Sequence, residues 1–175
     1  MNEYDFTLKF ALPSPDANLD DCVEQLGAAG CDDALIGVGR RGRVALAFTR
    51  EGETAELAVL SAIADVKSAL PDARLVEAAP DLVGLTDVAE LLDVSRQNMR
   101  KLILTSRAEP PVPVHEGKPT IWRLSKLLLW LREEKNYPVE EGLISLAKAT
   151  MQVNLAVELR DADEILQAEL RALVA

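Results

Sequence analysis

The sequence is poor in the residues that most often carry chemistry in small proteins. Of its 175 residues, only His115 is a histidine and only Cys22 and Cys31 are cysteines. Two cysteines form neither a disulfide framework nor a zinc-binding set, and they indicate small buried thiols in a reducing compartment. No convincing set of acid and nucleophile accompanies the lone histidine. The sequence therefore predicts a protein that is not an enzyme and that uses no metal or other cofactor.

Aromatic residues and long apolar runs are also scarce. Aromatic side chains make up 4% of the chain, so the core must be built mainly from Leu, Val, Ile and Ala. No apolar run reaches the length of a membrane span, and the first ten residues lack the basic and apolar regions of a signal peptide. We therefore expect a cytoplasmic protein that does not contact a membrane.

Basic residues are outnumbered, but unevenly along the chain. There are 19 Lys and Arg residues against 29 Asp and Glu residues, which gives a formal net charge of −10. The acidic excess lies in residues 1–80 and 138–175, whereas residues 95–126 contain seven basic and two acidic residues. The overall acidity therefore does not exclude an anionic partner for the central segment.

The first 80 residues predict a strand–helix–strand–strand–helix–strand order. Apolar and polar residues alternate over residues 3–12, which is the period of a half-buried strand. After a helical segment, two apolar runs flank the tight turn 39–42 of a hairpin, whose arginines could touch a partner. A second helix ends before Pro71, and a short strand follows it. This order resembles the ferredoxin-like fold, and we expect residues 1–80 to sense a small ligand or to bind a protein.

The central segment, residues 81–137, contains two short helical patterns separated by a sharp turn. It includes LTDVAELLDVSRQNMRKLI, in which Asp93 lies at the turn and Ser95 is placed to cap the second helix. The residues expected to face the core are Val88, Ala89, Leu92, Val94, Met99, Leu102 and Ile103. The second helix then presents a polar and basic face to solvent, formed by Arg96, Gln97, Asn98, Arg100 and Lys101.

This outward face suits the major groove of DNA. Arg can bind guanine through two hydrogen bonds, Gln or Asn can bind adenine, and Lys can bind guanine or a phosphate. Ser95 and the free N–H groups at the start of the helix can hold a backbone phosphate. The segment therefore predicts a surface that binds double-stranded DNA.

The same segment resembles a known family. Together with PPVPVHEGKPTIWRLSKLLLWL, it is similar from Leu85 to Leu131 to the winged helix-turn-helix of MerR-type regulators and of phage excisionase or AlpA-like proteins. The resemblance implies a two-stranded wing over Val112–Trp122 and a helix after it that closes the core. The wing residues expected near the DNA backbone are His115, Lys118 and Arg123.

The last segment, residues 138–175, is helix-prone almost throughout, with a possible break near Asp161. Its apolar residues recur at spacings of three and four, which indicates an amphipathic stripe. MerR regulators dimerise through a helix that follows the DNA-binding domain, and we expect the same of this segment. The alternative is that the helix packs back onto its own chain. The residues expected at the dimer contact are Leu143, Leu146, Val153, Val157, Leu166 and Leu170.

These patterns predict an α+β protein with an N-terminal ferredoxin-like domain, a central winged helix-turn-helix and a C-terminal helical dimerisation segment. The expected function is a homodimeric, sequence-specific regulator of transcription, with repression as the expected effect. A small-molecule effector or a toxin protein is the expected partner of the N-terminal domain. Two rival readings are an antitoxin that neutralises a toxin and autoregulates its operon, and an excisionase-like architectural protein. A scaffold that does not bind DNA is a further alternative.

Overall fold

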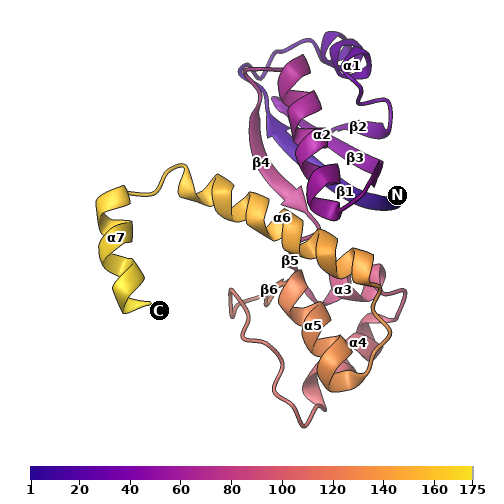
Figure 1. The fold of residues 1–175 in the computed structure, drawn as a ribbon, viewed down its shortest axis with the longest axis vertical. Helices are drawn as coiled ribbons and strands as arrows, with labels where there is room; N and C mark the ends of the chain where they lie inside the picture. The colour runs from indigo at the N-terminus through magenta and orange to yellow at the C-terminus, as the bar shows by residue number, and fades with distance from the viewer. Residues whose placement is uncertain (175) are drawn as a thin grey trace.

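Two bodies joined by a long helix make up the chain in the computed structural model, which describes residues 1–174 apart from the side chain of Val38 (Figure 1). Both helix and strand are well represented, so the protein belongs to the α+β class. The first body is a four-stranded sheet with helices on one face. The second is a group of short helices with a two-stranded sheet.

The first body contains the elements in the order expected from the sequence. They are β1 (Asn2–Ala11), α1 (Leu19–Ala28), β2 (Ala34–Val38), β3 (Arg43–Gly52), α2 (Ala55–Ala69) and β4 (Arg74–Ala79). The strands lie in the order β2-β3-β1-β4, and each neighbouring pair is antiparallel. Thr54 caps α2, because its side chain accepts a hydrogen bond from the Leu57 N–H at 3.2 Å.

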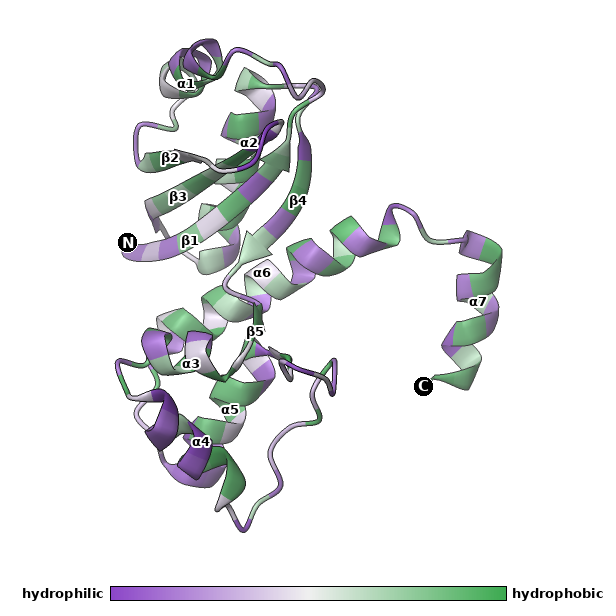
Figure 2. Cartoon of the chain, turned by 180° about the vertical axis from the view of Figure 1, so that it is seen from behind, coloured by the Kyte–Doolittle hydropathy of each residue, from purple (hydrophilic) through white to green (hydrophobic). Residues whose placement is uncertain are grey.

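The alternation along β1 and β3 gives the sheet one buried face. Phe6 and Leu8 of β1 lie beside Leu46 and Phe48 of β3 in a core that α1 and α2 cover. The rings of Phe6 and Phe48 stack with their centroids 5.3 Å apart. The residues between them along each strand point to the opposite face, which no helix of the first body covers (Figure 2).

An arginine is buried at the end of this sheet. The guanidinium of Arg50 donates to both carboxylate oxygens of Asp33 at 2.7 and 2.9 Å, to Asp65 at 2.7 Å and to the Gly30 carbonyl at 2.9 Å. The hydrogen bonds to Asp33 raise the pKa of Arg50, so the guanidinium keeps its charge although it is buried. This network fixes the segment that leads into β2.

The second body holds the two helices expected from the central segment. Its elements are β5 (Leu82–Val83), α3 (Leu85–Leu91), α4 (Arg96–Leu104), β6 (Trp122–Arg123) and α5 (Leu124–Lys135). Every residue predicted to face inward is buried or half-buried, with Val88 and Met99 completely so. Asp93 has a φ of 51°, which confirms the left-handed turn between α3 and α4.

The long helix α6 (Glu141–Leu159) packs against both bodies. Leu146 and Ala149 lie in the core beneath the sheet, whereas Ile144 and Ala147 lie in the core of the second body. Since residues 144 and 147 face one core and residues 146 and 149 face the other, the apolar surface of the helix is wider than a single stripe. The helix therefore holds the two bodies together within one chain.

This packing corrects the dimer contact expected from the sequence. Leu146 is only 3% exposed and is not available to a second copy, whereas Leu143 and Val153 are half-buried against the two cores. Val157 is half-buried. The periodicity correctly indicated an amphipathic helix, but the surface that it covers belongs to the same chain.

The last helix, α7 (Glu164–Leu173), extends away from both bodies (Figure 1). None of its residues is buried, and Leu166 is 50% exposed. Leu166 is therefore the one residue of the expected dimer contact that is exposed, and Leu170, like Val157, is half-buried. The described chain contains no helix that is both long enough and apolar enough to span a membrane.

Candidate nucleic-acid interface

The position of α4 is set by the turn and the cap at its N-terminal end and by its buried side. The left-handed turn at Asp93 lets the Val94 N–H bond to the Ala89 carbonyl at 2.9 Å, which brings α4 across α3. The Ser95 hydroxyl accepts a hydrogen bond from the Asn98 N–H at 3.1 Å and caps the helix as expected. Met99 and Ile103 anchor the helix in the core, so its opposite side faces solvent.

The outward side of α4 is polar, basic and free of ion pairs. Arg96, Gln97, Asn98, Arg100 and Lys101 are all exposed. Within residues 1–174, no carboxylate lies within ion-pairing distance of the three basic side chains among them. In Figure 2, α4 is the most continuously hydrophilic helix of its body. We call these five residues the α4 face.

Most of the α4 face surrounds one shallow hollow on the surface. The hollow is lined by Ser95, Gln97, Asn98, Arg100, Lys101, Leu104 and Thr105. Leu104 is 67% exposed there, although it is an apolar residue on a polar helix face. Apolar side chains can contact thymine methyl groups in base recognition, so an exposed leucine at this place is compatible with a groove-binding surface.

The wing is shorter than the resemblance implies. The isolated bridge between His115 and Ile121 is the one strand pairing within Val112–Trp122, and the segment before it is irregular. Trp122 pairs instead with Val83 of β5. Four prolines between residues 110 and 119 remove the N–H donors that a longer ladder would need.

His115 and Lys118 are exposed at the tip of this short hairpin. A Cβ at Gly117 would lie 2.2 Å from His115 Nε2, so a larger residue there would displace the exposed imidazole. In both views, the segment between α4 and β6 returns on the side of α5 away from α4 (Figures 1 and 2). The structure therefore groups most of the α4 face with Ser95 around one hollow, whose lining does not include His115 or Lys118.

Arg123 does not have the position expected for a DNA contact. Its side chain is 10% exposed, forms an ion pair with the buried Asp81, and lies 3.5 Å from Glu158. Asp81 also accepts a hydrogen bond from the Asn154 amide at 2.8 Å. Arg123 thus stabilises the junction between β5, β6 and α6, and the prediction that it binds the DNA backbone was wrong. Nothing in the sequence pairs Asp81 with Arg123, because 42 residues separate them.

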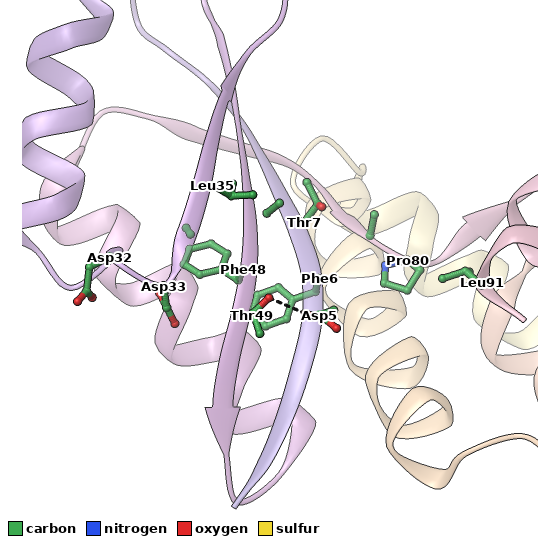
Figure 3. Close-up of a pocket in the computed structure, with 13 residues that line it drawn as sticks. Asp5, Phe6, Thr7, Asp32, Asp33, Leu35, Phe48, Thr49, Pro80 and Leu91 are labelled. Atoms are coloured by element: carbon green, nitrogen blue, oxygen red, sulfur yellow. Dashed lines mark hydrogen bonds between the residues drawn. The ribbon is translucent and has the colours of Figure 1, made fainter. Parts of the chain in front are cut away.

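A second hollow, of about 590 Å³, lies over the open face of the sheet (Figure 3). Asp5, Thr7 and Thr49 line it from the central strands, and Leu91 lines it from α3. The Thr49 hydroxyl donates to Asp5 at 2.6 Å. Because both bodies contribute side chains, a molecule bound in this hollow would contact the sheet and the helix that precedes the α4 face. The sequence analysis did not find it, since its residues come from distant segments.

Comparisons of the chain with known protein families, with curated proteins and with solved structures give no match. The resemblance to winged helix-turn-helix proteins therefore stays a prediction based on the residues quoted for it. No group of His, Cys, Asp and Glu residues suited to a metal ion is found in the part of the chain that the structure describes. What the arrangement offers chemically is an exposed, cationic helix face with amide and guanidinium donors.

Proposed function

We propose that the chain is a sequence-specific DNA-binding regulator of transcription, with the α4 face as the element that enters the major groove. The observation that carries this proposal is the exposure of five hydrogen-bonding side chains on α4, whose basic members form no ion pair with any carboxylate of residues 1–174. These side chains match the donors and acceptors of base edges, and they form a basic patch on a chain that is acidic overall.

We assign residues 1–80 to the ferredoxin-like fold and residues 81–137 to a winged helix-turn-helix. The strand order β2-β3-β1-β4, with both helices on one face, supports the first assignment. The second is supported by the crossing of α3 and α4, the left-handed turn between them, and the closing helix α5. The acidic first body would repel non-specific DNA, so that binding depends on the correct site.

We further propose that the regulator acts as a homodimer. One α4 face reads few base pairs, whereas two copies read two half-sites separated by about 34 Å or a multiple of it, one turn of DNA. On α7, Leu166 is the exposed member of the expected dimer contact, and Leu170 beside it is half-buried. The hollow in Figure 3 is the place proposed for an effector or a protein partner of the first body.

The test is selection of bound fragments from a random library of double-stranded DNA, using the full chain. We expect a recovered site with two related halves. The variant Arg100→Ala with Lys101→Ala should then lose binding to that site. Its matched control is Lys148→Ala with Arg171→Ala, which also removes two positive charges but on exposed positions of α6 and α7. No enrichment of any sequence, or equal loss in both variants, would contradict the proposal.

A further inference from the structure

The two edge strands of the four-stranded sheet differ in whether other side chains cover their main-chain groups. At one edge, the Asn154 side chain accepts from the Ala78 N–H at 2.8 Å and donates to the Ala78 carbonyl at 2.7 Å. Arg160 donates to the Leu75 carbonyl at 2.6 Å. Helix α6 thus covers the main chain of β4. Strand β2, at the other edge, has no such cover among the described residues.

The free main-chain groups of β2 can be identified from the ladder. The Thr49 N–H donates to the Asp33 carbonyl at 3.1 Å, so position 33 belongs to a hydrogen-bonded pair. Hydrogen-bonded and non-hydrogen-bonded pairs alternate along an antiparallel ladder. With Ile36 opposite Leu46 of β3, the N–H and carbonyl of Ile36 therefore point out of the sheet.

Strand β2 also lacks the features by which proteins usually protect an edge. It contains no proline, no lysine and no bulge. Leu35 is 81% exposed on the open face, and a Cβ at its neighbour Gly37 would meet only the Ala45 carbonyl, at 3.8 Å. The strand therefore presents an exposed leucine beside a vacant position on the same face.

We propose that a second copy of this chain adds to β2, antiparallel and centred on Ile36, so that the two sheets become one of eight strands. This register places Leu35 of each copy opposite Gly37 of the other, where each leucine fills the space above the glycine. In this register Ile36 of one copy lies opposite Ile36 of the other. The outward-pointing N–H of each Ile36 can then donate to the carbonyl of the other. Both helix layers then stay on one side of the joined sheet.

Charge complementarity identifies a second copy as the occupant. Two aspartates precede β2 and arginines follow it, so an antiparallel copy places Asp32 opposite Arg40 at both ends of the shared strands. Both side chains are exposed and without an ion pair in the described chain, whereas Asp33 is already bound to Arg50. A partner strand without an acidic residue before it and a basic residue after it would leave Asp32 and Arg40 unpaired or facing like charges.

The first test is sedimentation of the full chain without DNA, so that it does not depend on the proposed function. Leu166→Asp with Leu170→Asp removes α7 as a contact, and this background should still dimerise. Adding Leu35→Lys should raise the dimer dissociation constant by on the order of ten-fold or more, since each dimer loses two leucine–glycine contacts and gains two like charges at diagonal positions across the shared strands. Adding Leu57→Lys, at a 52% exposed position on α2, should not. A monomeric background, or equal effects of the two lysines, would overturn the proposal.

The second test addresses the register by native mass spectrometry. Asp32→Arg alone and Arg40→Asp alone should each weaken the homodimer, because like charges then face each other. Mixing the two single variants should restore association as a heterodimer, since each contact regains one acid and one base. Singles that dimerise as the parent does, or a mixture that yields no heterodimer, would overturn the antiparallel pairing.

Discussion

Replacement of Asp81 by alanine should destabilise the protein far more than loss of an ordinary surface carboxylate. The Asp81 side chain is 0% exposed and pairs with Arg123, which is 10% exposed. Removing Asp81 leaves the buried Arg123 charge with only the longer, 3.5 Å contact to the exposed Glu158, and breaking a buried pair in this way costs about 3–5 kcal/mol. The Asn154 amide also loses the acceptor that it holds at 2.8 Å. Urea denaturation, followed by circular dichroism, would measure the change in the free energy of unfolding.

Glu77→Ala is the matched control for this prediction. Glu77 pairs with Lys9 at 2.7 Å, but the two side chains are 39% and 46% exposed, so its loss should cost less than about 1 kcal/mol. The double variant Asp81→Leu with Arg123→Met should recover most of the lost stability, because apolar residues can replace a buried ion pair. If Asp81→Ala changes the free energy of unfolding as little as Glu77→Ala, the buried pair does not hold the junction.

Two further predictions concern buried and exposed side chains. Burial, with a contribution from Asp65, raises the pKa of the Cys31 thiol to about 11. Because the unfolded thiol ionises first, its contribution to stability is complete below pH 9 and is lost as the pH rises towards 11; Cys31→Ala should therefore flatten the alkaline fall in stability, and an unchanged slope would contradict this. Met99→Ala, at a fully buried position of α4, should cost about 2–5 kcal/mol in thermal or urea unfolding, whereas Leu104→Ala, at a 67% exposed position, should cost little but weaken DNA binding. Equal stabilities of these two variants would mean that α4 is not anchored as described.

The sequence predicted those parts of the fold that depend on local patterns. Alternation over residues 3–12 predicted β1, and the inward residues of α3 and α4 were those that the structure buries. The turn at Asp93 and the cap at Ser95 could also be predicted, because each depends on the chemistry of one or two neighbouring residues. The same holds for the exposure of the α4 face, which follows from the positions of Met99 and Ile103.

The failures concern residues whose partners are distant in the sequence. Arg123 looked like a DNA contact because nothing local shows that Asp81 lies beside it. Leu146 looked like a dimer contact because an amphipathic stripe does not reveal whether its cover comes from the same chain. The wing was predicted from a resemblance, and its prolines allow only one bridge. Tertiary contacts, rather than local propensity, decide each of these cases.

The position of the α4 face in the major groove can be tested most directly by methylation interference on the selected DNA site. Dimethyl sulfate modifies guanine at N7 in the major groove and adenine at N3 in the minor groove, and Arg is expected to bind guanine N7 and O6. Methylation of guanine within each half-site should prevent binding of the wild-type chain. For the Arg100→Ala variant, methylation of at least one of these guanines should no longer affect binding. Interference confined to adenine N3, or none at all, would contradict recognition through this helix.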